Sequence, residues 1–335
     1  MPMNAATSAF LLAVHRAARR MAHAAFKPWL FHELVQLLRF DSGMWLRVGV
    51  TDAGPQMHDY YLDRQRPDRI TAYLEQELWR EDPFLQTSFG GGPVRAWVMS
   101  ANDLPPGRLS DYLELHEQRH VVCSFEFEPV TRSFAGFSMF RRGHEDTFSE
   151  ADRSLVEFIE PHLRDDWTHN WLREVGAWRP PELPSDFAQS VCTADHLLNA
   201  SDEHFAELIL REWPHWHGPL LPDEWAMHLQ LDALGPWVGR LVTAYFQTLP
   251  GGLILLRLRP IHALDLLPPR KRQVALLFAG GVSQSEVAAA LALSPSTVNN
   301  YLVEVYRELG LRDKTELALC VARLTPPHPN ANSLP

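Results

Sequence analysis

The stretch that decides the fold lies near the C-terminus, at residues 267–318: LPPRKRQVALLFAGGVSQSEVAAALALSPSTVNNYLVEVYRELGLRDKTELA. Apolar residues recur in it every three or four positions, which is the period of a helix with one buried face. Gly281 and Gly310 each follow such a segment, where a helix typically ends in a left-handed residue. The stretch therefore predicts four short helices: over 270–279, from Gln284, over 295–309 and from Lys314.

The starts of the second and third helices carry capping signals. Ser283 and Glu286 have the spacing of a capping box, in which each side chain binds an otherwise unpaired backbone N–H. Ser294 followed by Pro295 combines a capping hydroxyl with the first helical position, where proline is tolerated. Only residues 292–294 separate these two helices, so they are expected to form a helix-turn-helix.

The second helix of such a pair enters the major groove of DNA with its N-terminus first. Asparagine pairs bidentately with adenine, and serine or threonine hydroxyls donate to phosphate. On this basis the candidate DNA-binding residues are Ser294, Ser296, Thr297, Asn299, Asn300, Val303, Arg307 and Lys314.

This stretch resembles the LuxR-type (NarL-like) helix-turn-helix family. The matching positions are Leu267, Arg270, Val274, Leu277, Ala279, Gly281, Ser283, Glu286, Ala288, Leu291, Ser294, Thr297 and Val298. The resemblance implies a transcriptional regulator that binds double-stranded DNA as a homodimer, and that contacts RNA polymerase if it is an activator. The fourth helix, with Leu317 and Val321, is expected to form part of the dimer contact.

The chain departs from the family pattern at charged positions. Asn299 stands where the family usually has lysine, Tyr301 where it has histidine, and Lys271 where it has glutamate. The third helix keeps only Arg307 as a basic residue and adds Glu304 and Glu308. Each lost phosphate contact weakens salt-dependent binding, so we expect modest affinity per monomer. The alternative is a helix-turn-helix that contacts only proteins.

The charge of the whole chain is unevenly distributed. The 335 residues carry a net charge of −10, which by itself argues against a nucleic-acid-binding protein. Residues 267–324, however, contain seven basic and five acidic residues, and the remaining 24 basic and 36 acidic residues give the rest a net charge of −12. An acidic body with a mildly basic C-terminal module is typical of a regulator whose end contacts DNA.

The N-terminal part predicts alternating strands and helices and thus an α/β body. Expected strands are 43–50, 94–99, 121–130 and 134–141, and expected helices are 27–40, 69–80, 112–119 and 149–166. A second set follows the proline-rich linker at 179–184: strands at 186–192, 237–247 and 252–259, and helices at 202–212 and 222–230. Residues 1–32 hold no acidic residue, which a transit peptide shares, but we interpret them as an amphipathic lead-in helix.

Residues 29–164 resemble the GAF-like domains of other LuxR-type regulators, and residues 179–260 resemble a small PAS-like domain. The fold expected is therefore an α/β GAF/PAS-like sensory body followed by an all-α four-helix helix-turn-helix domain. The predicted domains are 1–178, 179–263 and 264–325, with a disordered tail at 326–335. Domains of these folds often hold a small ligand in an apolar pocket.

Acyl-homoserine-lactone sensors of the LuxR family share a Tyr, an Asp-Pro pair and a Trp, and this chain resembles them at Tyr73, Asp82-Pro83 and Trp97. The resemblance implies that Asp82 accepts a hydrogen bond from a ligand amide while Tyr73 and Trp97 donate to carbonyls. A further tryptophan of that family is replaced here by Arg69. The simpler interpretation, which we favour for the lactone itself, is that Asp82-Pro83 forms a turn and Trp97 packs in the core.

Other classes of function find less support in the sequence. Cys123, Cys192 and Cys320 lack the spacing of a zinc site or a disulfide framework, which favours a reducing cytoplasm. His215 and His217 lack partner ligands, and Glu126 and Glu128 are expected on a solvated strand face. We recognise no phosphorylated receiver domain, catalytic motif, cofactor motif, metal site or membrane-spanning stretch. The sequence thus predicts a cytoplasmic, non-enzymatic regulator controlled by a small-molecule or protein signal.

Overall fold

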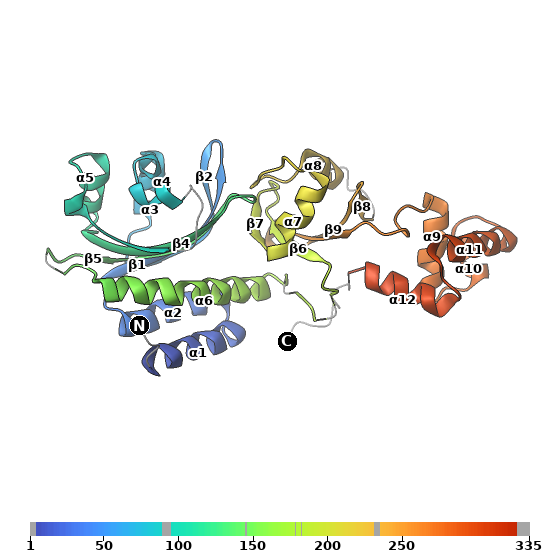
Figure 1. Cartoon of the computed structure of the whole chain (residues 1–335), viewed down its shortest axis with the longest axis horizontal. Helices are drawn as coiled ribbons and strands as arrows, with labels where there is room; N and C mark the ends of the chain where they lie inside the picture. The colour runs from blue at the N-terminus through green and yellow to red at the C-terminus, as the bar shows by residue number, and fades with distance from the viewer. Residues whose placement is uncertain are drawn as a thin grey trace.

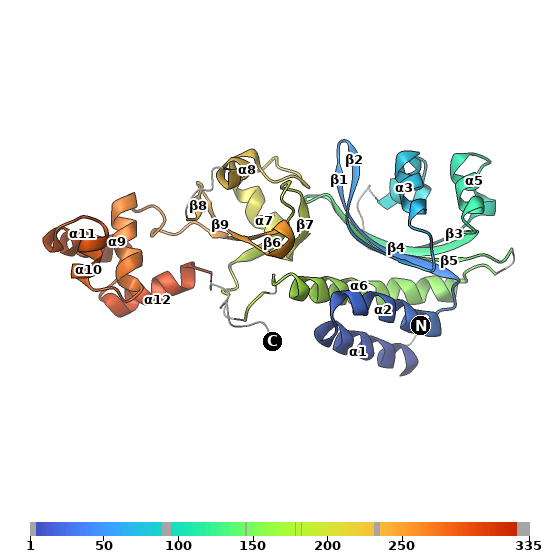
Figure 2. The same ribbon diagram turned by 180° about the vertical axis from the view of Figure 1, so that it is seen from behind.

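The computed structural model describes residues 5–88, 95–144, 146–177, 179–181, 183–230 and 235–326. All of the predicted tail except residue 326 lies outside these residues, as does residue 94 at the start of the strand expected over 94–99. The parts of the chain lie in a row, with two β-sheets followed by the C-terminal helices, as Figure 1 and Figure 2 show from opposite sides. This confirms the expected fold class, an α/β body followed by an all-α module.

The first sheet has five strands in the order β2-β1-β5-β4-β3, and all neighbouring pairs are antiparallel. Its strands are β1 (Ser42–Thr51), β2 (Gly54–Asp63), β3 (Arg95–Ser100), β4 (His120–Glu128) and β5 (Ser133–Arg141). Helices lie on both faces of this sheet (Figure 1). One face carries α1 (Ala5–Arg20), α2 (His23–Leu37) and α6 (Glu150–Glu174). The other carries α3 (Asp68–Glu75), η1 (Leu78–Arg80), α4 (Pro83–Ser88) and α5 (Arg108–Leu115), with η2 (Ala101–Asp103) following β3.

Side chains alternate in direction along the strands, so each face of the sheet contributes apolar residues to a separate core. In β4, Val122 joins the core formed with α1, α2 and α6. Val121, Cys123 and Phe125, which point the opposite way, join the core on the other face. The two faces of the sheet are therefore both buried, and a cavity lies on the second face.

Two helix predictions need correction in this part. The expected helix over 69–80 is divided into α3 and η1, because Glu77 adopts a left-handed backbone conformation with φ of 52°. The helix α6 starts at the predicted Ser149 capping box but continues to Glu174, because Trp167 and Trp171 in its extension are buried.

The second sheet has the order β7-β6-β10-β9-β8, again with antiparallel pairs. Its elements are β6 (Ala188–Cys192), β7 (Leu198–Ser201), α7 (Glu203–Glu212), α8 (Asp223–Gln230), β8 (Trp237–Val238), β9 (Val242–Thr248), η3 (Pro250–Gly252) and β10 (Ile254–Pro260). The single strand expected over 237–247 is interrupted. The backbone N–H groups of Arg240, Leu241 and Val242 donate to the Glu212 carboxylate, at 2.9, 2.7 and 3.1 Å. The N–H groups of Arg240 and Leu241 are thereby lost to the strand ladder, and β9 begins only at Val242.

Two buried arginines form hydrogen bonds between successive parts of the chain: Arg47 between the first and second sheets, and Arg259 between the second sheet and the C-terminal helices. Arg47 of β1 donates to Thr168 Oγ1 of α6 at 2.7 Å and to Asn199 Oδ1 of β7 at 3.4 Å. Arg259 of β10 forms an ion pair with Asp265, at 2.6 and 2.9 Å, and donates to the carbonyl of Leu324 at 2.8 Å. We call Arg259, Asp265, Tyr245 and the Leu324 carbonyl the Arg259 cluster.

The C-terminal module contains α9 (Pro269–Ala279), α10 (Gln284–Ala290), α11 (Pro295–Leu309) and α12 (Lys314–Leu324), as predicted. Its core gathers apolar residues from all four helices, including Val274, Val287, Leu302 and Leu317. Within the described residues, the structure has no helix that combines the length and apolarity needed to cross a membrane.

Candidate ligand pocket and helix-turn-helix

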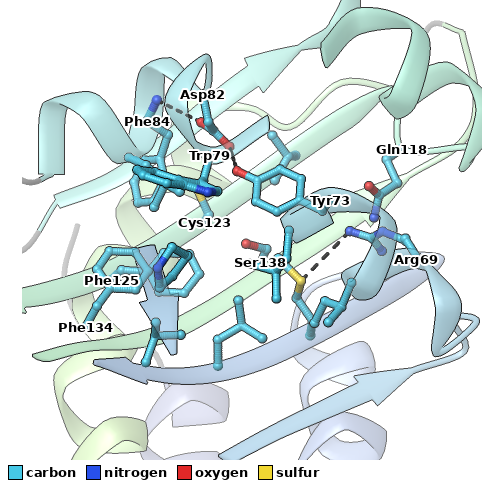
Figure 3. Close-up of a pocket in the computed structure, with 18 of the residues that line it drawn as sticks. Arg69, Tyr73, Trp79, Asp82, Phe84, Gln118, Cys123, Phe125, Phe134 and Ser138 are labelled. Carbon is cyan, nitrogen blue, oxygen red and sulfur yellow. Dashed lines mark hydrogen bonds between the residues drawn. The ribbon is translucent and has the colours of Figure 1, made fainter. Parts of the chain in front are cut away.

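A cavity of about 110 Å³ lies between the first sheet and the helices α3, η1, α4 and α5 (Figure 3). Its wall is mostly apolar, with aliphatic and aromatic side chains from β1, β2, β4 and β5 as its floor. The apolar wall includes Met44, Leu46, Val48, Val50, Met57, Ile70, Leu74, Leu85, Val121, Phe125, Phe134 and Phe140. An apolar cavity with a few polar groups is the usual form of a small-molecule site.

Tyr73 and Asp82, two of the predicted ligand residues, line this pocket but bind each other. The Tyr73 hydroxyl donates to Asp82 Oδ2 at 2.8 Å, and the backbone N–H of Phe84 donates to Oδ1 at 3.0 Å. Burial raises the pKa of the Asp82 carboxyl, against the opposing effect of these two hydrogen bonds. Burial also raises the pKa of Tyr73 well above its ordinary value, and the nearby Asp82 adds to the shift.

Trp97, the third predicted ligand residue, does not belong to the pocket lining. It lies on β3, its side chain is 37% exposed, and its ring meets that of Phe84 edge-on with centroids 6.1 Å apart. Phe84 does line the pocket, so Trp97 packs against a lining residue without lining the cavity itself. The structure thus brings together two of the three residues and separates the third from the cavity.

The pocket has a second polar group, which the sequence analysis did not assign as a site. Arg69 of α3 and Gln118, just before β4, both line the cavity and lie side by side (Figure 3). They are 6% and 1% exposed. Burial lowers the pKa of Arg69, whereas the hydroxyls of Tyr112 and Tyr73 oppose that shift. No local motif marks Gln118; only the pairing of β4 with its neighbours places it at the cavity.

The remaining polar candidates have structural partners. Glu126 forms an ion pair with Arg164 of α6, and Glu128 accepts from the backbone N–H groups of Val130 and Thr131. His215 and His217 lie in the loop between α7 and α8. Among the residues that the structure describes, no group of three potential metal ligands comes together.

The helix-turn-helix is formed as its capping signals predict. Ser283 Oγ accepts from the N–H of Glu286, whose carboxylate accepts from the N–H of Ser283. Ser294 Oγ accepts from the N–H of Thr297 at 3.0 Å. Gly310 ends α11 with φ of 68°. These local features fix where α10 and α11 begin and where α11 ends, and therefore which residues α11 presents to solvent.

The predicted DNA-binding residues fall into two groups. Ser296, Asn299, Asn300, Val303 and Arg307 are exposed on α11. The others contact side chains of the module itself: the hydroxyl of Ser294, which is also exposed, lies 2.7 Å from that of Thr297, and the Lys314 ammonium lies 4.2 Å from the centre of the Phe278 ring. The first group forms a nearly neutral face whose exposed side chains can reach another molecule.

Two departures from the family pattern compensate each other. The Lys271 ammonium of α9 lies 2.5 Å from Glu304 and 2.8 Å from Glu308 of α11. The hydrogen bonds to these two glutamates raise the pKa of Lys271. The acidic residues of α11 are therefore paired within the module, and their repulsion of a phosphate backbone is reduced.

Comparison with known proteins places the C-terminal module in a family. Residues 265–321 match the family described as bacterial regulatory proteins, luxR family. An HTH-type transcriptional regulator of Mycobacterium bovis is 37% identical over 67 residues, which cover 20% of this chain and 8% of that protein. The response regulator GacA of Pseudomonas viridiflava is 37% identical over 59 residues, which cover 18% of this chain and 28% of that one. This chain thus matches well under half the length of these relatives.

Solved structures resemble the chain more broadly but weakly. Escherichia coli SdiA covers 94% of this chain and 97% of its own length, with 12% identity and a TM-score of 0.41. The N-acylhomoserine-lactone-dependent LuxR-family factor CepR2 of Burkholderia cenocepacia covers 50% of this chain and 93% of its own, with 12% identity and a TM-score of 0.38. What the family match and the four helices establish together is that residues 265–321 are a helix-turn-helix domain of the luxR family of bacterial regulatory proteins.

Proposed function

We propose that this protein is a LuxR-type transcriptional regulator that binds double-stranded DNA as a homodimer and responds to a small molecule in the pocket of its first domain. The observation that carries the proposal is the capped α10–α11 pair with its exposed Asn299 and Asn300, within a segment that matches the luxR family. The three domains proposed are 1–178, 179–263 and 264–325, the second of them PAS-like.

The nearly neutral face of α11 favours a second candidate. A helix that reads DNA usually gains much of its affinity from lysine and arginine contacts to phosphate. Here only Arg307 is an exposed base on the described face. A helix-turn-helix that contacts a protein instead of DNA would have this character. We do not extend the proposal to an acyl-homoserine lactone, because Trp97 does not line the pocket and Arg69 replaces a further tryptophan of the lactone sensors.

The experiment is a fluorescence-anisotropy titration of full-length protein on DNA from directly upstream of its reading frame, at several salt concentrations, with and without host-cell extract. If the upstream DNA contains no binding site, duplexes enriched from a random library by binding to the protein are used in its place. Saturable binding that weakens with salt supports DNA as the partner. Absence of salt-sensitive binding to any duplex would instead select the protein-contact function.

Asn299→Ala and Asn300→Ala test base reading in the same assay. Each is expected to weaken binding to the specific duplex about tenfold, the value of one good base contact, and to leave a scrambled duplex nearly unaffected. Thr315→Ala, an exposed residue on α12, is the matched control and is expected to change neither. An equal loss on both duplexes would remove the two asparagines from base recognition.

A further inference from the structure

The pocket has two polar ends, and their side chains differ in how fully they are hydrogen-bonded within the protein. At one, Asp82 and Tyr73 bind each other and Asp82 also accepts from a backbone N–H. At the other, which we call the Arg69 end, Arg69 and Gln118 line the cavity together (Figure 3). A ligand gains most where it satisfies groups that the protein leaves unsatisfied.

Arg69 is a buried cation without an acidic partner. Its Nε donates to the Tyr112 hydroxyl at 3.1 Å, one terminal nitrogen donates to Gln65, and the other lies 3.9 Å from the sulfur of Met44. The guanidinium also lies 4.8 Å from the centre of the Phe140 ring. Among the described residues no carboxylate lies within ion-pair distance of it. Arginine stays protonated at neutral pH, so the positive charge remains in the cavity wall.

The energetic position of Arg69 is therefore unfavourable in the ligand-free pocket. A buried charge is costly unless it is paired, and the hydroxyl, amide and ring contacts supply only partial compensation. A guanidinium carries five N–H donors in a planar fork, and three contacts leave donors for an incoming group. The fork matches the two oxygens of a carboxylate.

Gln118 adds an independent sign that a polar group belongs here. Its side chain is 1% exposed, and neither Nε2 nor Oε1 has a hydrogen-bond partner in the structure. Buried amides are nearly always bonded, so an unbonded one that lines a cavity points to a ligand. Nε2 can donate to a carboxylate, and Oε1 can accept from a hydroxyl beside it.

We infer that the pocket binds an amphipathic monocarboxylate, with its carboxylate against Arg69 and Gln118 and its hydrocarbon tail along the apolar wall. A hydroxyl next to the carboxylate fits the acceptor of Gln118. This inference names the ligand class of the regulator proposed above and rests on that proposal only for the effect on DNA. Direct binding measurements separate the two, because they need no DNA.

The test is isothermal titration calorimetry on full-length protein with four probes whose short tail suits a cavity of about 110 Å³: butanoate, β-hydroxybutanoate, butanol and N-butanoyl homoserine lactone. At pH 7.5 the two acids are ionised and the other two are neutral. We expect the acids to bind at least tenfold more tightly than butanol, because an interaction with a charged group exceeds that factor. β-Hydroxybutanoate is expected to be the tightest.

Three variants connect this preference to the Arg69 end. Arg69→Met keeps the length of the side chain but removes its charge, so it should abolish the preference for acids over butanol. Gln118→Glu places a carboxylate beside Arg69, so it should raise the melting temperature of the ligand-free protein and reduce butanoate affinity at least tenfold. Arg66→Met, at an exposed arginine that pairs with Asp68, should change neither.

The outcomes are decisive in each case. Equal affinity for butanoate and butanol, tighter binding of the lactone, or no binding of any probe would overturn the inference. If Arg69→Met fails to fold, Gln118→Glu still decides, because retained butanoate affinity in that variant also contradicts it. Butanoate binding with no effect on DNA would leave the ligand class standing and contradict only the proposed function.

Discussion

The Arg259 cluster is expected to hold the helix-turn-helix module to the body, and Arg259→Met tests this. The guanidinium is 1% exposed, pairs with both oxygens of Asp265, and donates to Tyr245 Oη at 2.8 Å and to the Leu324 carbonyl. That carbonyl is at the end of α12, where helical backbone acceptors lack intrahelical partners. Burial works to raise the pKa of Asp265, but Arg259 outweighs it and holds that pKa below its usual range.

Methionine at position 259 would leave the Asp265 carboxylate buried with the backbone N–H of His262 as its remaining strong donor. Removing one partner of a buried ion pair costs about 3–5 kcal/mol, a large part of the roughly 5–15 kcal/mol that stabilises a domain. Replacing both partners, as in Arg259→Met with Asp265→Leu, removes the unpaired charge, so the double variant should regain at least about 2 kcal/mol relative to the sum of the single changes.

The assay is urea unfolding of the full-length variants, followed by circular dichroism, with thermolysin cleavage of the connecting segment 261–268 as a local measure. Arg240→Met is the control, because that side chain is 83% exposed in its pair with Glu212 and should change stability by less than about 1 kcal/mol. A loss below about 1 kcal/mol in Arg259→Met, or additive costs in the double variant, would refute the reasoning.

Three further predictions concern other parts of the chain. Burial raises the pKa of Glu160 from 4.5 to about 7, and its Oε2 lacks a partner. Because the folded state keeps this proton to higher pH than the unfolded state, wild-type stability falls as pH rises from 4.5 to about 7. Glu160→Gln should flatten that fall and add up to about 3 kcal/mol at pH 8, measured by urea unfolding; an unchanged pH profile would contradict it. Leu302→Ala should cost about 2–5 kcal/mol because Leu302 is buried in the module core. Its neighbour Val303 is 57% exposed, so Val303→Ala should alter stability by less than about 0.5 kcal/mol while weakening specific DNA binding; the reverse ranking in thermal melts would disprove the assigned faces. Lys271→Ala should lower the melting temperature by leaving Glu304 unpaired, and less so in high salt; a loss that salt does not reduce would exclude an ionic origin.

The sequence predicted the helix-turn-helix closely because its signals are local. The hydroxyls of Ser283 and Ser294 and the left-handed Gly310 fix helix ends within a few residues of themselves. The strands β2 and β7 were not predicted. Both are edge strands, and β2, with the sequence GPQMHDYYLD, is only half-buried along most of its length and lacks strict alternation of apolar residues.

The pocket was predicted only in part because its wall comes from many elements. Tyr73 and Asp82 lie close in sequence, and both reach the cavity. Arg69 and Gln118 meet only because α3, which follows β2, covers a sheet in which β1 lies beside β5, a pairing of distant segments. The sequence marked Arg69 as a departure from lactone sensors but had no means of showing that its charge lacks a carboxylate partner.

The central claim is that occupancy of the pocket controls DNA binding. It is tested most directly by the dissociation constant of the full-length protein on its specific duplex, with and without saturating β-hydroxybutanoate. The account predicts that the ligand changes this dissociation constant at least about fivefold, the lower end of allosteric coupling. In the Gln118→Glu variant the ligand is expected to leave the dissociation constant unchanged. Identical dissociation constants for the wild-type protein, with calorimetry showing the ligand bound, would contradict it.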